Sequence, residues 1–171
     1  MIHLSYHPAF DAYNAIFRFL RIKMRENVVT LEFDKLRILD YYLLFPWRAH
    51  NVRLLQKDLD IRRVAKALEV KKDYAVLPAG DVLLERMKSA HTAAIQTLVK
   101  DGYVLEDRFN VGVVAFTDQS IPLDIVARIA ERNGQEPEVM TIIDRLKVYS
   151  LMGVDGLKGR TALLEYRYDK I

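Results

Sequence analysis

Cysteine is absent from this sequence of 171 residues, which excludes disulfide bonds, thiolate metal sites and a cysteine nucleophile. Long hydrophobic runs are absent as well, so no segment is expected to span a membrane. The first residues, MIHLSYHPAFDAY, lack the basic and then apolar segments of a secretion signal. Together these absences predict a soluble protein of the cytoplasm.

The composition that remains is that of a globular protein. Apolar residues make up 51% and charged residues 29%, which is enough to form a hydrophobic core, and the length suits a single domain spanning residues 1–171. The net charge of +3 is unevenly distributed, because residues 1–80 contain 14 Lys and Arg against 9 Asp and Glu, while residues 81–171 contain 12 against 14. The excess positive charge therefore belongs to the N-terminal half.

The segment AAIQTLVKDGYVLEDRFNVGVVAFTD, from Ala93 to Asp118, has the order of a recognition helix followed by a wing. Its apolar residues first recur at helical spacing, and Gly102 then supplies the left-handed cap that ends a helix without strain. A strand over 103–105, a polar turn over 107–110 and a β-branched strand over 111–117 follow. This order predicts a winged helix.

We therefore predict an α+β, mainly helical fold, with a winged helix-turn-helix core and helical additions at both ends. Residues 1–33 form an aromatic helix and a short strand, residues 34–118 form the core, with a basic helical insertion near 47–80, and residues 119–171 form helices and a final strand near 161–168. Within the core, the first helix spans about 34–45, a second begins at Asp81, and the recognition helix covers 89–101.

No catalytic or metal-binding arrangement is recognisable. The four histidines, His3, His7, His50 and His91, do not have metal-ligand spacing. The segment GVDGLKGRT at 153–161 lacks the spacing of a phosphate loop, and no GxSxG sequence is present. We therefore expect a protein that is not an enzyme, with no cofactor, no metal and no small-molecule substrate.

The predicted recognition helix is poorly equipped to read bases. Its polar side chains are Ser89, His91, Thr92, Gln96, Thr97 and Lys100. Only Lys100 carries a formal charge, only Gln96 suits bidentate base contacts, and the wing residues Arg108 and Asn110 are offset by neighbouring acids. Docking of another protein is therefore favoured over sequence-specific DNA binding.

Two other groups of residues are candidates for binding. The first is an apolar, largely aromatic face at helical spacing, which serves either a partner or internal packing: Phe10, Tyr13, Phe17 and Leu20. The cations that follow it, from Arg18 to Arg25, are expected to be solvated. The second group is basic and contacts either solvent or phosphate: Arg62, Arg63, Lys66, Lys71 and Lys72. The acids Asp58, Asp60 and Glu69 lie close to it in the sequence.

Three segments carry a resemblance to a known family. YHPAFDAYNAIFRFLRI at 6–22, LEFDKLRILDYYLLFPWRAHNVRL at 31–54 and IQTLVKDGYVL at 95–105 resemble the middle component of ABC-three-component systems. That group includes the small winged-helix subunit of Lamassu-type bacterial defence. The resemblance implies a non-catalytic adaptor between an SMC-like ABC ATPase and an effector, often a nuclease.

Alternative functions remain open from the sequence alone. The adaptor reading allows contacts between the basic group and the DNA backbone. A homodimeric winged-helix transcriptional regulator that binds a palindrome is the main alternative. A third option is an antitoxin-like subunit that silences a toxic effector through the same contacts.

Overall fold

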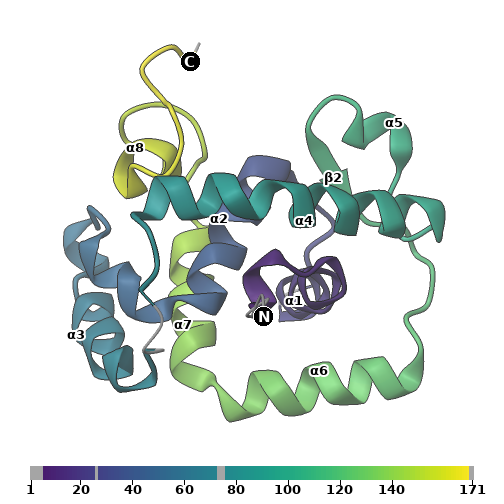
Figure 1. Cartoon of the computed structure of the whole chain (residues 1–171), viewed down its shortest axis with the longest axis horizontal. Helices are drawn as coiled ribbons and strands as arrows, with labels where there is room; N and C mark the ends of the chain where they lie inside the picture. The colour runs from purple at the N-terminus through teal and green to yellow at the C-terminus, as the bar shows by residue number, and fades with distance from the viewer. Residues whose placement is uncertain (1–5, 26, 73–75, 170–171) are drawn as a thin grey trace, which may run out of the picture.

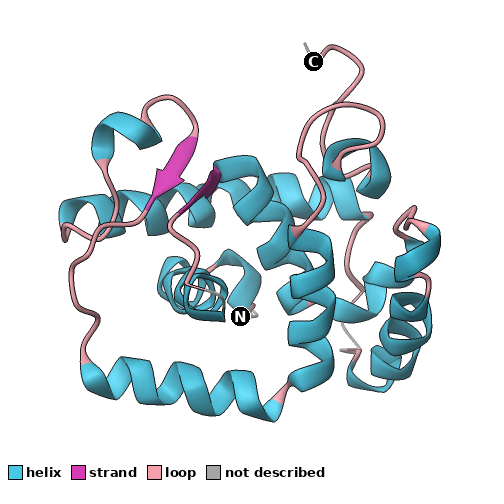
Figure 2. Cartoon of the chain, turned by 180° about the vertical axis from the view of Figure 1, so that it is seen from behind, coloured by secondary structure: helices cyan, strands magenta, loops and turns pink. Residues whose placement is uncertain are grey.

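The computed structural model describes residues 6–25, 27–72 and 76–169. The protein is mainly helical, with one small antiparallel sheet (Figures 1 and 2). The α-helices are α1 (Ala12–Arg25), α2 (Phe33–Leu44), α3 (Asp60–Ala67), α4 (Gly80–Lys100), α5 (Glu106–Phe109), α6 (Leu123–Gln135), α7 (Pro137–Lys147) and α8 (Leu157–Thr161). The 3₁₀ helices are η1 (Pro8–Phe10), η2 (Pro46–Asn51), η3 (Gln56–Asp58) and η4 (Leu68–Lys71), and the strands are β1 (Thr30–Glu32) and β2 (Val113–Ala115).

Local sequence signals explain where two of the main helices begin and end. At the start of α1, the backbone N–H of Asn14 donates to Asp11 Oδ1 at 2.7 Å, so Asp11 satisfies a backbone donor that the helix leaves unpaired. At the end of α4, Gly102 has φ +82° and its N–H donates to the carbonyl of Val99. The predicted left-handed cap at Gly102 is confirmed.

Helix α1 lies at the centre of the molecule and is seen nearly end-on in Figure 1. It contacts α4 on one side and α6 on the other, and α2 packs against both α1 and α7. Helix α3 packs on η2 at the edge far from α5 and β2 (Figures 1 and 2). The core lies where these helices meet, and its large fully buried side chains include Phe19, Leu39, Tyr41, Met87, Ile95 and Ile129. None of the described helices is long and apolar enough to cross a bilayer.

The sheet pairs β1 with β2 in antiparallel register, with Leu31 opposite Val114. The expected strand over 103–105 is reduced to a single bridge between Val104 and Phe116. The turn that follows it contains the short helix α5, and the expected strand over 111–117 is shortened to β2. The hairpin was therefore predicted in position but not in detail.

Three predicted boundaries were wrong. The expected second and recognition helices are one continuous helix, α4, because the sequence LERMKSAHTAAIQTL contains neither glycine nor proline to interrupt it. The expected strand over 161–168 is absent from the described residues, since Thr161 ends α8 and no strand follows up to Asp169. The amphipathic sequence PLDIVARIAERNG predicts a helix that ends at Asn133 and Gly134, but helix α6 continues through Gly134 to Gln135.

Candidate partner-binding groove

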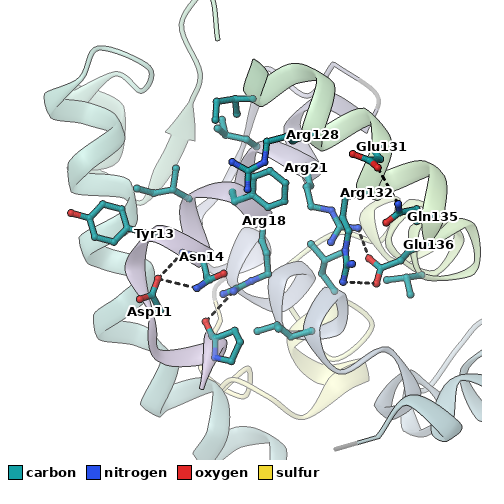
Figure 3. Close-up of a pocket in the computed structure, with 18 of the residues that line it drawn as sticks. Asp11, Tyr13, Asn14, Arg18, Arg21, Arg128, Glu131, Arg132, Gln135 and Glu136 are labelled. Atoms are coloured by element: carbon teal, nitrogen blue, oxygen red, sulfur yellow. Dashed lines mark hydrogen bonds and ion pairs between the residues drawn. The ribbon is translucent and has the colours of Figure 1, made fainter. Parts of the chain in front are cut away.

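An open groove with a volume of about 1290 Å³ runs along the outer face of α1. One wall is formed by α6, and the other includes the end of α4 together with Tyr103 and Ile121 from the segments that follow it. The N-terminal residues Tyr6 to Pro8 also line it. The groove therefore joins segments that are far apart in the sequence, from Tyr6 to Val139, around one helix (Figure 3).

Three of the four predicted partner-binding residues line this groove. Tyr13 is 81% exposed and lies on the side away from the charged residues of α6 (Figure 3). Phe17 is half-buried, with the guanidinium of Arg128 5.7 Å from its ring centre, and Leu20 is buried in the groove floor. Phe10, in η1, is exposed but lies outside the lining, with its ring 5.7 Å from that of His7.

The wall formed by α6 carries charges of both signs. Arg132 and Glu136 form an ion pair at 3.1 Å, and the Gln135 amide donates to Glu131 at 3.3 Å (Figure 3). Together with Arg128 these side chains make the wall polar, whereas the floor formed by α1 is largely apolar. The groove can therefore hold an apolar side chain at its floor while its wall contacts charged groups.

Two arginines of α1 are buried, although the sequence led us to expect solvated cations. Arg18 donates to both carboxylate oxygens of Asp40, at 2.6 and 3.0 Å, and to the carbonyl of Pro8 at 3.0 Å. Asp40 Oδ2 also lies 2.8 Å from His91 Nε2. This cluster of Arg18, Asp40 and His91 ties α1 to α2, α4 and the N-terminal segment.

Asp40 is fully buried, and its charge is maintained by these contacts. Burial by itself raises the pKa of a carboxyl group, but the charge of Arg18 and the hydrogen bond from His91 outweigh it, and the pKa of Asp40 lies below its usual value. Asp40 is therefore ionised at neutral pH and forms a buried ion pair with Arg18.

Arg21, three residues after Arg18 in α1, forms a second buried contact set. Its guanidinium donates to Asn133 Oδ1 at 2.8 Å and to Glu136 Oε2 at 2.7 Å. The Asn133 amide donates in return to the carbonyl of Arg21 at 3.3 Å. Because Asn133 and Glu136 lie at the junction of α6 and α7, Arg21 fixes the position of the groove wall relative to α1.

The predicted basic group lies elsewhere, on α3 and η4. All five of its side chains are exposed: Arg62, Arg63, Lys66, Lys71 and Lys72. Of these, Lys71 also lines the groove. Asp58, which the sequence places beside the group, is buried and does not share its surface.

The predicted recognition surface is only partly exposed. Ser89, Gln96 and Lys100 are exposed on α4, and the wing residues Arg108 and Asn110 are exposed near α5. Thr92 and Thr97 are half-buried. His91, which we had counted as a polar residue able to face a base, is fully buried against Asp40. Its position among apolar neighbours on the inner stripe of α4 explains the error.

The histidines and the glycine-rich segment take structural positions. His7 Nδ1 accepts a hydrogen bond from the N–H of Ala9, and its ring stacks on Phe45. His3 lies outside the described residues. Within residues 6–25, 27–72 and 76–169, no group of three or more His, Asp and Glu side chains has a metal-binding arrangement. In the segment 153–161, Gly156 and Gly159 pack tightly on neighbouring carbonyl groups.

Sequence reasoning missed α6 as a wall of the groove. Its amphipathic pattern was recognised, but Ile125, Arg128 and Glu131 lie more than 100 residues after the α1 residues that they face across the groove. No local signal connects the two helices. The nearest usable signal was the half-polar character of α6, of which only Ile129 is fully buried.

The fold and the groove define the class of this chain: a small, mainly helical α+β protein with an open, part-aromatic groove along one helix. The family model for middle component 5 of ABC-three component (ABC-3C) systems matches residues 4–169, and the chain belongs to this family. No curated protein and no solved structure matched it. As a middle component, the chain is one part of a system of several components, and its partners are other components of that system.

Proposed function

We propose that this chain is a non-catalytic adaptor that bridges an SMC-like ABC ATPase and an effector, such as a nuclease, in a Lamassu-type defence system. The groove along α1 is the docking surface for one of these two partners. The observation that carries the proposal is the groove itself, in which the exposed Tyr13 and the half-buried Phe17 lie between a polar wall and the end of α4.

The chemistry of the groove suits a protein segment. Exposed aromatic side chains next to arginine are typical of the residues that dominate binding energy at interfaces. Here Tyr13 and Phe17 supply the apolar contact, and Arg128 lies over the Phe17 ring at the rim. The mixed charges of α6 favour one orientation of a partner over another. We therefore expect an occupant with one or two large apolar side chains flanked by charged residues.

The adaptor is proposed to use a winged helix as its scaffold. The order α1, β1, α2, α4, the Val104 bridge and β2 supports this assignment, with residues 45–79 as an insertion between the second and third helices. In this arrangement β1 pairs with β2, and Val104 pairs with Phe116, the residue that follows β2, as the strands of a wing do. The continuous helix α4 then takes the position of the recognition helix.

A homodimeric transcriptional regulator is the second candidate. It is favoured by one observation, namely that Ser89, Gln96 and Lys100 stay exposed on α4 beside the α5 turn. A regulator requires specific binding to a promoter fragment, whereas the adaptor requires stable association with two other proteins. The two functions are therefore distinguished by whether the purified chain retains two other proteins or binds a promoter fragment.

The test is co-expression of the full chain with its neighbouring components, with a purification tag on this chain. We expect the ATPase and the effector to be recovered in a stable ratio. Tyr13→Asp is expected to weaken one of these associations about 30-fold, which corresponds to the loss of about 2 kcal/mol at an interface hot spot. Tyr168→Asp is the matched control, because Tyr168 is 87% exposed and lies outside the groove.

Two outcomes would contradict this proposal. Recovery of a lone homodimer that binds one promoter fragment at physiological salt would establish the regulator in its place. Equal behaviour of the Tyr13→Asp and Tyr168→Asp variants, with both partners retained, would remove the groove from the adaptor function.

A further inference from the structure

Five exposed cations follow one another along α3 and η4: Arg62, Arg63, Lys66, Lys71 and Lys72. We call this surface the basic strip. Helix α3 ends at Ala67 and η4 spans Leu68–Lys71, so four of the five cations lie on one uninterrupted helical stretch and Lys72 directly follows it. At the usual rise per residue of the two helix types, that stretch is about 20 Å long.

Two of the acids that lie close to the strip in the sequence, Asp58 and Asp60, pair with an arginine of α7. Asp58 is buried, where it accepts hydrogen bonds from Tyr149 at 2.6 Å and from Arg145 at 2.9 Å. Asp60 lies 3.6 Å from the same Arg145. Glu69 is exposed. Arg145, from α7, therefore offsets part of the negative charge that the sequence places beside the strip.

The strip lies apart from the surface on which a winged helix reads DNA. Helix α3 lies at the edge of the molecule far from α5 and β2 (Figures 1 and 2). The stretch from Asp60 to Lys72 contains no aromatic residue, whereas protein interfaces are enriched in aromatic anchors. A stretch with five exposed cations and no such anchor fits a regular polyanion better than it fits a folded protein.

We propose that the basic strip binds the sugar–phosphate backbone of double-stranded DNA without reading its sequence. A duplex segment of about 20 Å presents on the order of 12 phosphate charges, which is more acceptors than the strip has cations. Arginine binds a phosphate through two parallel N–H donors, and lysine binds it as a point charge. This contact goes beyond the adaptor function and leaves most of the groove open to a protein.

The binding is measured with the full chain, by fluorescence anisotropy of a labelled 30-bp duplex between 50 and 200 mM NaCl. Three to five phosphate contacts, each contributing a slope of about −0.9 in log K against log salt, weaken binding about 40- to 500-fold over this range. Two duplexes of unrelated sequence are expected to bind with equal affinity.

Two triple variants locate the contact. Arg62→Gln/Arg63→Gln/Lys66→Gln removes three cations of the strip, and the slope is expected to become shallower by about 2.7. The matched control neutralises three exposed cations of α4: Arg86→Gln, Lys88→Gln and Lys100→Gln. It changes the net charge by the same amount, and we expect it to keep the slope. Equal thermal midpoints establish that both variants are folded.

Each contrary result is informative. Absence of duplex binding at 50 mM NaCl would overturn the proposal. A decrease in duplex affinity confined to the α4 variant would assign binding to the predicted recognition helix. Equal decreases in both variants would show that the duplex is attracted by the overall charge of the protein. Poly-glutamate and unlabelled duplex are compared as competitors at equal concentrations of negative charge. If poly-glutamate displaces the labelled duplex more effectively than unlabelled duplex does, the strip binds an acidic protein instead.

The outcome is distinguishable from that of the adaptor test. The strip variant is expected to retain the ATPase and the effector, because Tyr13 and Phe17 are unchanged. If the wild-type chain is purified without either partner but still binds the duplex in a salt-dependent manner, the adaptor function is refuted and this inference stands.

Discussion

The substitution Asp40→Asn removes the negative charge that Arg18 and His91 contact inside the core. The amide has nearly the shape of the carboxylate, but it is neutral and cannot accept hydrogen bonds at both of its ends. Arg18, which is itself buried, then keeps its charge without a counter-ion. We expect this to destabilise the protein strongly while its fold is preserved.

The magnitude follows from the burial of both partners. Removing one member of a buried ion pair costs about 3–5 kcal/mol, because the remaining charge is left desolvated. Domains of ordinary stability unfold with about 5–15 kcal/mol, so the loss is a large fraction of the total. At about 2–4 °C per kcal/mol for a chain of this length, the midpoint of thermal unfolding is expected to fall by about 6–20 °C.

The assay is urea unfolding followed by circular dichroism at pH 7, with Asp144→Asn as the control. Asp144 pairs with Arg25 at 3.0 Å, but the two side chains are 23% and 39% exposed. A surface pair of this kind is worth less than about 1 kcal/mol. A loss for Asp40→Asn as small as that for Asp144→Asn would refute the reasoning, since the buried charge would then not be what holds α1.

The same variant has a defined pH dependence. The pKa of Asp40 is lower in the folded protein than in the unfolded chain, so its contribution is fully present above about pH 4 and is lost as pH falls through the folded value. The free energy of unfolding of the wild type is therefore expected to fall more steeply below pH 4 than that of Asp40→Asn. Parallel curves between pH 3 and 7 would contradict this.

Three further substitutions test local packing by the same urea assay. Gly156→Ala places a Cβ against the carbonyl oxygen of Met152 and should cost about 1–3 kcal/mol. In contrast, Gly134→Ala lies in α6 with open space around it and should stabilise by about 0.5–1 kcal/mol. A loss at Gly134 or a gain at Gly156 would contradict these assignments. Tyr149→Phe leaves Asp58 without its 2.6 Å hydrogen bond and should cost about 1–3 kcal/mol, and a change below about 0.5 kcal/mol would show that the bond contributes little.

Features governed by neighbouring residues were predictable from the sequence. Gly102 was expected to end its helix because only glycine adopts positive φ there without strain, and its φ is +82°. The aromatic face of α1 was expected from three- and four-residue spacing, and Tyr13, Phe17 and Leu20 do line one groove. Both patterns are complete within a few residues, which is why a single sequence contains them.

Features governed by distant residues were not predictable. In the sequence, Arg18 and Arg21 have the pattern of a solvated helix end. The acids that pair with them lie elsewhere, because Asp40 is on another helix and Glu136 is at the junction of α6 and α7. The basic strip was recognised from the sequence, but Arg145, which pairs with the nearby acids Asp58 and Asp60, lies on α7. Charge patterns along one helix do not identify which acids of other helices will contact it, so such contacts require the tertiary structure.

The two buried arginines connect the helices that form the groove to one another. Arg18 reaches both Asp40 and the carbonyl of Pro8, so it fixes the rotation of α1 and the course of the N-terminal segment at once. Arg21 fixes the groove wall through Asn133 and Glu136. An apolar side chain at either position would make none of these hydrogen bonds, and the hydrophobic effect that would remain is not directional. A partner that enters the groove therefore meets helices that are already positioned, and its affinity is not reduced by the cost of ordering them.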